Sequence, residues 1–216
     1  MRAITKGQLP RSLVEHRANA HANYANYADK DGLRAALVRD QRGLCCYCMA
    51  RVEATATAMK IEHWRCQSRN ADLELTYSNL LAACLGGHGQ PEALQHCDTR
   101  KAEHELKFNP AEPNHRIEQY IRFEMDGTIA SSDADFNAQL NDVLGLNLPV
   151  LKNRRKAVVD GLMGWLRDYR ARHHRGPDIA TLERMKAKKL PAAGMLEPFV
   201  RVAVWWLDQR LARRAA

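Results

Sequence analysis

The spacing of the cysteines constrains the fold of this chain more than any other feature of its sequence. All six fall inside one quarter of the 216 residues, between positions 45 and 97. The first residues lack the apolar run of an export signal, so we expect a reducing compartment, where thiols bind metals more often than they form disulfides. Cys45 and Cys48 form a C-x2-C pair, the spacing at which two thiolates on a tight turn reach one tetrahedral Zn²⁺.

A C-x2-C pair supplies only half of a zinc site, so two further ligands are needed. Cys84 and Cys97 are the candidates, because glycines between them make the loop flexible enough to fold both thiols back. His88 and His96 lie in the same loop, and either could replace one cysteine. We predict a structural zinc ion held by Cys45, Cys48, Cys84 and Cys97. Two thiols are left over as ordinary small buried residues, Cys46 and Cys66.

The positive charge of the chain is concentrated in its C-terminal third. Lys and Arg number 33 against 25 Asp and Glu, a net charge of +8. Residues 151–216 hold 16 basic and 6 acidic residues, a net of +10, which leaves −2 for residues 1–150. Lys and Arg that face phosphates gain affinity by releasing counterions, so this third is either a polyanion-binding surface or simply a solvated helical one.

The composition is that of an ordinary globular protein, with 45% hydrophobic and 27% charged residues. No apolar stretch approaches the roughly 20 residues that a membrane-spanning helix needs. We therefore expect neither secretion nor membrane insertion, and a cytoplasmic location.

Hydrophobic periodicity and turn signals predict an α+β chain that is mostly helical. Asp31, Asp98 and Asp178 are the expected helix N-caps. The predicted helices span residues 11–27, 31–43, 98–106, 151–175, 178–189 and a last stretch from about 198. The predicted strands span 59–64, and 117–123 with 127–129 as a hairpin. The Trp205-Trp206 pair in the last helix is predicted to be core rather than a base-stacking platform.

Three short motifs lie between and after the two zinc half-sites. They are Ile61-Glu62-His63-Trp64, Tyr77-Ser78-Asn79-Leu80-Leu81 and Asp98-Thr99-Arg100-Lys101. With C-x-Y-C ahead of them and a cysteine directly before the last, this order resembles an HNH endonuclease of the ββα-metal fold. The fold class implied is a mostly helical α+β chain with a central, zinc-stapled ββα-metal core.

The chain is most similar to the Septu- and retron-associated HNH nucleases, the PtuB-like family. The likeness covers essentially the whole chain, including Met1-Arg2, Leu9-Pro10, Leu33-Arg34, Gln41, His96-Cys97-Asp98, Asn109-Pro110 and Trp205-Trp206-Leu207. Three positions depart from the common HNH pattern: Glu62 stands where Asp is frequent, Asp98 where Asn or His is, and Cys66 where Pro is. The resemblance implies an N-terminal helical segment (1–43), an HNH core with structural zinc (44–112), and a C-terminal hairpin and basic helical region (113–216).

The resemblance also assigns the reaction to named residues. His63 is the candidate general base, because a histidine with a pKa near roughly 6.5 can take a proton from water at neutral pH. Glu62 and Asp98 are the candidate ligands of a catalytic Mg²⁺ or Mn²⁺, since hard cations prefer carboxylate oxygens. Strand alternation alone points Glu62 and His63 to opposite faces, so Glu62 has to reach the metal around a twisted strand end.

Other polar residues of the motifs receive supporting roles. Asn79 is expected to hold the loop that carries His63, and Arg100 and Lys101 to contact phosphate. His104 is a weak additional ligand candidate, because six residues after Asp98 it lies on another helical face.

The leading hypothesis is a metal-dependent nuclease acting on nucleic acid. The resemblance further implies a role in anti-phage defence with a partner ATPase encoded alongside, for which residues 151–216 are a candidate docking surface, and it leaves a homo-oligomer open. One alternative is a catalytically silent zinc-binding module that holds nucleic acid or a partner protein. A redox protein that uses C-x2-C is a weaker alternative, because no thioredoxin-like strand pattern surrounds Cys45.

Overall fold

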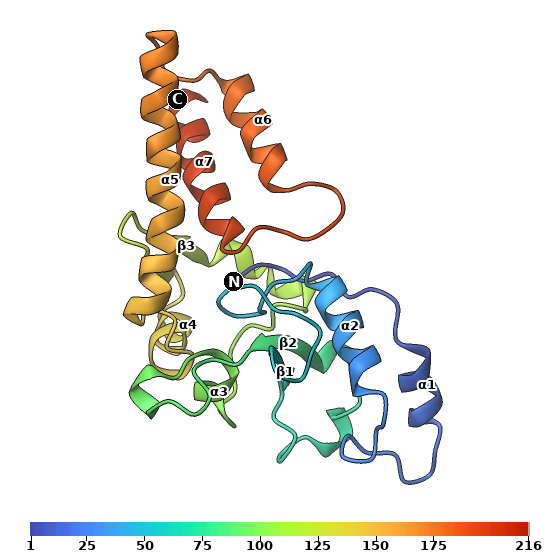
Figure 1. Cartoon of the computed structure of the whole chain (residues 1–216). Coiled ribbons are helices and arrows are strands. Elements are labelled where there is room, and N and C mark those ends of the chain that lie inside the picture. The colour runs from blue at the N-terminus through green and yellow to red at the C-terminus, as the bar shows by residue number, and fades with distance from the viewer. Residues whose placement is uncertain (216) are drawn as a thin grey trace.

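Helices and two short antiparallel sheets make up the chain, in a computed structural model that describes residues 1–215 (Figure 1). The α-helices are α1 (Arg11–Arg17), α2 (Lys30–Asp40), α3 (Cys97–Lys101), α4 (Ala134–Ala138), α5 (Pro149–His173), α6 (Ile179–Lys189) and α7 (Val200–Ala215). The strands are β1 (Met59–His63), β2 (Leu80–Cys84), β3 (Ile121–Phe123) and β4 (Ile129–Ser131). Short 3-10 turns are η1 (Ala71–Leu73), η2 (Tyr77–Asn79), η3 (Glu92–Leu94), η4 (Pro113–His115) and η5 (Ile117–Gln119), and η6 (Gln139–Val143) is a π-helical turn. Across the described residues, no helix has both the length and the apolar character needed to cross a membrane.

Strands β1 and β2 form the central sheet. They pair antiparallel, with Met59 opposite Cys84 and His63 opposite Leu80. The Gln41 side chain at the end of α2 donates to the Ala82 carbonyl oxygen at 2.8 Å and accepts from the Ala82 amide at 2.7 Å. This buried amide bonds both backbone groups of Ala82 in β2, and so it fixes α2 against the sheet.

The second sheet is a β3–β4 hairpin, which confirms the predicted hairpin with shifted strands. Asp126 accepts a hydrogen bond from the Thr128 amide at 2.9 Å, and Gly127 has a φ of +86°. A β-carbon on Gly127 would collide with the backbone carbonyl of Lys152 in α5. The Asp-Gly turn therefore provides close backbone contact between the hairpin and α5 as well as reversing the chain.

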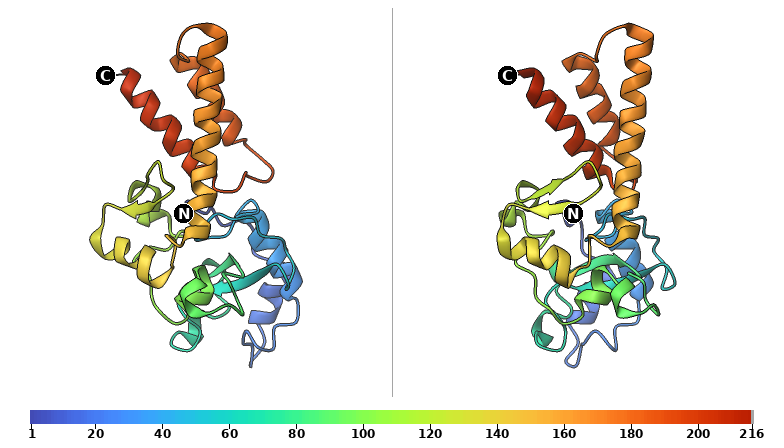
Figure 2. Two further views of the ribbon diagram at one scale, coloured as in Figure 1. Left: turned by 60° about the vertical axis from the view of Figure 1, so that its left-hand side comes forward. Right: turned by 90° about the vertical axis from the view of Figure 1, so that its left-hand side faces the viewer.

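Helices α5, α6 and α7 project together from the rest of the molecule and are called the helical arm below (Figure 2). Asp178 caps α6 by accepting from the Thr181 amide at 2.8 Å, as predicted. Val202, Trp206 and Leu207 of α7 are buried, also as predicted. With 25 residues, α5 is about 37 Å long, which carries the end of the arm well away from the central sheet.

Two predicted helices are shorter in the structure. The helix predicted over 11–27 ends at Arg17, because Asn23 and Asn26 each accept from the other's backbone amide at 2.9 Å and so form a turn instead. The cap of the next helix is Asp29 rather than Asp31, with its side chain accepting from the Gly32 amide.

The helix predicted over 98–106 ends at Lys101, because Ala102 adopts a φ of +46° that no helix can continue through. Its first residue is Cys97 and its N-cap residue is His96, which makes no side-chain cap. Asp98 therefore lies inside the first turn, where its carboxylate is free to face the sheet rather than to cap the helix.

Arg155 lies on the inward face of α5 and is 1% exposed. It donates to the carbonyl oxygen of Gly127 at 2.5 Å and to that of Leu146 at 2.6 Å. Burial lowers the pKa of this guanidinium to about 10. An arginine on the buried face of a helix adds nothing to the hydrophobic periodicity of that helix, so the sequence pattern does not identify Arg155 as buried.

Candidate metal centre and adjoining cleft

The four predicted cysteines converge on one point. Their Sγ atoms all lie within 4.8 Å of one another, and the cluster comprises Cys45, Cys48, Cys84 and Cys97. The Sγ atoms of Cys45 and Cys97 are 3.9 Å apart, and those of Cys48 and Cys84 are 3.7 Å apart. A tetrahedron with metal–sulfur bonds of roughly 2.3 Å has edges of about 3.8 Å. These side chains could therefore hold a metal such as zinc, as the spacing predicts.

The backbone of the first half-site forms a tight turn. The Met49 amide donates to the Cys45 carbonyl at 3.1 Å, and the Cys45 amide donates to the Ala50 carbonyl at 2.9 Å. Met49 has a φ of +66°, which closes the turn. The Ala50 amide donates to Cys48 Sγ at 3.4 Å, which helps to hold that side chain in the turn.

The second half-site depends on the glycine loop between β2 and α3. Gly86 has a φ of +57°, and a β-carbon there would collide with the backbone carbonyl of His96. The His96 amide in turn donates to the Gly86 carbonyl at 2.9 Å, which brings Cys97 back beside Cys84. The glycines thus allow the chain reversal that their spacing predicts.

Neither histidine of this loop belongs to the four-cysteine cluster. His88 is exposed, and His96 Nδ1 lies 3.2 Å from Cys97 Sγ, where an N–H would support the thiolate. Burial raises the pKa of the Cys97 thiol, with the neighbouring thiols as the next cause. Metal binding at the cluster therefore has to release protons.

One cleft of about 560 Å³ lies beside this cluster, at the end of β1. Glu62 and His63 of β1 and Asp98 of α3 all line it, together with Cys66 and Glu74. Two of the predicted residues on β1 thus reach the same cavity, although strand alternation alone would separate them. The fourth predicted residue, Asn79, lies behind the cleft and does not line it.

Glu62 is the most deeply buried acid of the cleft, at 3% exposed. Its Oε1 atom accepts from the Tyr47 hydroxyl at 2.7 Å and lies 2.8 Å from Lys101 Nζ. Burial, followed by the neighbouring Asp98 carboxyl, raises the pKa of Glu62 well above its usual range, while Lys101 opposes the shift. Two carboxyl groups so close together repel when both are ionised, and a cation between them relieves that repulsion.

His63 is held at one ring nitrogen only. Its Nε2 atom lies 3.0 Å from the carbonyl oxygen of Glu74, and its ring packs edge-on against Tyr24 with centroids 4.6 Å apart. Burial lowers the pKa of His63, which favours the neutral form of the ring. Because a carbonyl oxygen only accepts, Nε2 carries the proton and Nδ1 is the basic nitrogen.

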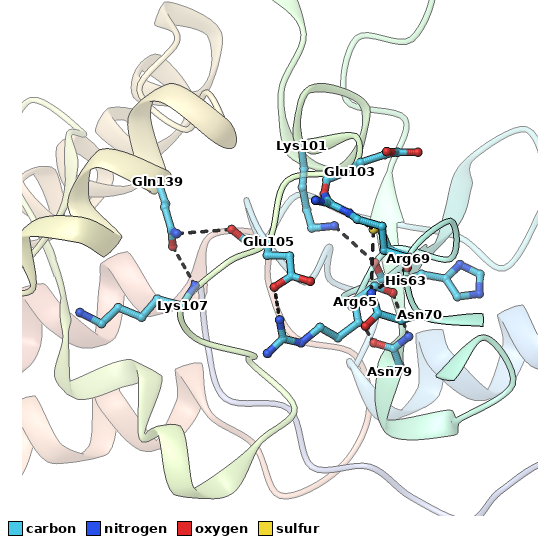
Figure 3. Close-up of polar contacts among 11 residues, drawn as sticks. His63, Arg65, Arg69, Asn70, Asn79, Lys101, Glu103, Glu105, Lys107 and Gln139 are labelled. Atoms are coloured by element: carbon cyan, nitrogen blue, oxygen red, sulfur yellow. Dashed lines mark hydrogen bonds and ion pairs between the residues drawn. The ribbon is translucent and has the colours of Figure 1, made fainter. Parts of the chain in front are cut away.

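Asn79 is buried and bonds to two segments at once, and Figure 3 shows the first of them, at Arg65. Its Oδ1 atom accepts from the Arg65 amide at 2.7 Å, and its Nδ2 atom donates to the Arg65 carbonyl at 3.1 Å and the Leu73 carbonyl at 3.2 Å. Arg65 follows His63 by two residues, and Leu73 precedes Glu74. Asn79 therefore fixes both the loop after His63 and the segment whose carbonyl orients the His63 ring.

Lys101 does not lie where the phosphate prediction requires it. Its ammonium donates to the His63 carbonyl at 3.3 Å (Figure 3). Its side chain is 1% exposed and pairs with Glu62. The short helix α3 packs against β2 and turns this residue inward, so the prediction of a surface phosphate contact is wrong for Lys101. Arg100 is partly exposed and donates to the Asp142 carbonyl at 3.1 Å.

Two other residues differ from their sequence-based interpretation. Cys66, predicted to be a packing residue, lines the cleft and accepts from Arg69 Nε at 3.3 Å, and this hydrogen bond lowers the pKa of its thiol. His104 is exposed on the turn after α3 and does not line the cleft. Tyr47 belongs to the site through Glu62, and its place inside C-x-Y-C was the only sequence signal for it.

Neither family models nor curated proteins match this chain. The geometry of the four cysteines and of the cleft therefore provides the basis for assigning a function. The structure holds a cluster of four buried thiols and, next to it, a cleft whose lining includes the carboxyl groups of Glu62 and Asp98 and the ring of His63.

Proposed function

We propose that this chain is a metal-dependent HNH endonuclease that hydrolyses phosphodiester bonds in nucleic acid. The supporting observation is that His63, Glu62 and Asp98 line one cleft although they come from two elements. The order β1, β2, α3, with α3 against β2 and a four-cysteine cluster at their ends, agrees with a ββα-metal core.

Glu62 and Asp98 are the residues that would hold Mg²⁺ or Mn²⁺. Carboxylate oxygens at the edge of an open cleft suit such ions, which keep several water ligands. When bound, the ion supplies positive charge that stabilises the pentacoordinate phosphate and the leaving oxygen. Lys101 pairs with Glu62, and Lys60 Nζ lies 3.6 Å from Asp98 Oδ2, so the same two acids already attract cationic groups of the protein.

His63 would generate the nucleophile. Its Nδ1 atom takes a proton from a water molecule, whose oxygen attacks phosphorus while the bond from phosphorus to the leaving oxygen breaks. The Glu74 carbonyl stabilises the resulting imidazolium by accepting from Nε2 at 3.0 Å. Asn79 keeps this carbonyl and the His63 loop in register by bonding to both segments.

Zinc at the four cysteines would have a structural role. Cys97 directly precedes Asp98, and Cys84 ends the strand paired with β1, so the cluster holds together the elements that carry both acids. A site with four thiolate ligands is closed and leaves no coordination position for water.

A cleavage assay tests this proposal. The full chain should cut plasmid DNA or structured RNA in the presence of Mg²⁺ or Mn²⁺, and EDTA should stop it. His63→Ala should abolish cutting while the circular dichroism melt is kept. His104→Ala is the matched control, because His104 is exposed outside the cleft and should cut like the parent. If His63→Ala cuts as well as the parent, the proposal is wrong.

The resemblance also leads us to propose a role in anti-phage defence with a partner ATPase. The basic C-terminal third, residues 151–216, is the proposed docking surface. Co-purification of the full chain with the neighbouring ATPase tests this role. Complete loss of co-purification when exposed lysines of α6 are reversed in charge supports it, and unchanged recovery contradicts it.

A second candidate is a catalytically silent, zinc-stabilised module that binds nucleic acid or a partner. The observation in its favour is that the Lys101 ammonium already occupies a Glu62 oxygen at 2.8 Å, so an internal cation satisfies one of the two acids. This candidate predicts binding that weakens steeply with salt and no turnover with any divalent ion.

A further inference from the structure

The far end of the helical arm holds a second concave site. The last turns of α5 and α7, with the turn before α6, enclose a pocket of about 200 Å³. Leu166 and Leu182 form part of its wall. Four guanidinium groups line it, and we call it the arginine pocket: Arg170, Arg210, Arg213 and Arg214.

The arginine pocket has no matching negative charge. Within residues 1–215, none of its four arginines makes an ion pair with a carboxylate, and no Asp or Glu lines the pocket. Asp178 and Glu183 directly follow the wall residues Pro177 and Leu182 in sequence, and the Asp178 carboxylate caps α6. Burial, followed by Arg213 and Arg170, lowers the pKa of Arg210 to about 10. Converging positive charges of this kind repel one another until an anion joins them.

The fold holds two of these arginines in place. Arg210 stacks on the buried Trp206 ring, with its guanidinium carbon 3.1 Å from the ring centroid, and donates to the Trp206 carbonyl at 3.3 Å. A β-carbon on Gly176 would come within 2.8 Å of Arg214 Nη2, so this guanidinium lies directly against the glycine backbone. Donors that are already positioned lose little side-chain entropy when a ligand binds.

We propose that the arginine pocket binds a phosphate group. The planar guanidinium presents its N–H donors in a fork that matches two oxygens of a phosphate, and several forks can share one phosphate or diphosphate. The phosphate comes either from the backbone of a nucleic acid or from a free phosphate compound such as pyrophosphate. Both sources share the same chemistry, and binding can separate them.

The pocket lies far from the cleft, so a nucleic-acid phosphate bound there would anchor the strand at a distance from it. Because α5 is about 37 Å long, a duplex lying along it covers about eleven base pairs between the two ends of the helix. The pocket then anchors the strand remote from the cleft of β1 and α3. Phosphate binding does not depend on the proposed nuclease activity, and it persists if cleavage is never observed.

Binding by the full chain tests the proposal with two charge-matched double variants. Arg213→Ala with Arg214→Ala removes two positive charges from the pocket. Arg172→Ala with Lys188→Ala removes two from exposed positions of the same arm outside it. Fluorescence anisotropy with a labelled duplex of about 20 base pairs reports affinity. The pocket variant should bind about tenfold more weakly, and the control within about twofold of the parent.

Two further measurements separate the two sources of phosphate. If the parent binds inorganic pyrophosphate in calorimetry and the pocket variant does not, the ligand is a free phosphate compound. If the pocket variant loses only duplex binding, the ligand is the nucleic-acid backbone. Arg170→Ala, on a different helix, repeats the test if the last turn of α7 unfolds in the first variant. Equal losses in the pocket and control variants, or a parent that binds neither probe, overturn the proposal.

Discussion

The ammonium of Lys101 lies 2.8 Å from Oε1 of Glu62, and both side chains are almost completely buried, at 1% and 3% exposed. A buried ion pair is sensitive to loss of one partner, because the other charge is left without compensation. Lys101→Met keeps most of the volume and removes the charge. We expect it to lower the free energy of unfolding by about 3 kcal/mol at neutral pH, measured by urea denaturation.

The loss of unfolding free energy in Lys101→Met should depend on pH, in a direction set by the pKa of Glu62. Burial and Asp98 raise the pKa of Glu62 in the folded state, and loss of Lys101 raises it further. An acid with a raised folded pKa favours folding at low pH, and this contribution disappears as pH rises through the folded pKa. The destabilisation by Lys101→Met should therefore shrink towards acid pH. A loss that is constant from acid to alkaline pH would contradict the pairing.

The lowered pKa of His63 predicts how cleavage activity falls on the acid side of its pH profile. Burial lowers its pKa, so the folded state favours the neutral ring; that contribution to stability is present above the unfolded pKa and lost as pH falls through the folded pKa. Cleavage should reach a plateau near neutral pH and fall on the acid side at a lower pH than an ordinary histidine would set. An NMR titration of the His63 ring checks the direction. A His63 pKa above the ordinary histidine value of about 6.5 would show that burial does not control it.

Metal analysis tests the cysteine cluster. The purified chain should contain one zinc ion, and Cys97→Ser should lose it together with much of the thermal stability. Cys66→Ser is the matched control, because Cys66 lies outside the cluster and should leave the zinc content unchanged. Zinc in the Cys97→Ser protein at the level of the parent would show that the four thiols do not act as one site.

Asn79 should act as a positioning residue. Asn79→Asp keeps the acceptor for the Arg65 amide and loses the two N–H donors, whereas Asn79→Ala loses all three bonds. We expect losses in stability of at least about 2 kcal/mol for Asn79→Asp, whose carboxylate faces the two carbonyl oxygens, and about 3 kcal/mol for Asn79→Ala. If Asn79 orients His63 through Glu74, kcat should fall more than KM changes, and the acid limb of the pH profile should shift. Changes in stability alone would indicate a purely structural role.

Local sequence patterns predicted the helical arm, the hairpin and the four-cysteine cluster. Each depends on short-range chemistry: the cap at Asp178, the Asp-Gly turn at Gly127, and the C-x2-C knuckle at Cys45. The lengths of the first helix and of α3 were not predictable in this way. They depend on side-chain bonds between Asn23 and Asn26 and on the backbone at Ala102, where propensity gives no warning.

The candidate site was only partly predictable from the sequence, because some of its contacts depend on how separate segments pack. The motifs named Glu62, His63 and Asp98, and these residues do share a cleft. The sequence could not show that Lys101 turns inward, because an exposed and a buried lysine look the same on a helix of five residues. Cys66 beside Arg69 was equally hidden, since their contact depends on a loop between elements.

The four-cysteine cluster has a consequence for the length of the loops between its members. Cys48 and Cys84 lie 36 residues apart, and Cys45 and Cys97 lie 52 apart, so one ion bound by all four would close two nested loops. The entropy lost on closing a loop grows only logarithmically, and doubling its length costs about 0.6 kcal/mol. The exposed stretch around His88 can therefore gain residues at little cost, provided that the turn at Gly86 still returns Cys97 to the other three thiols.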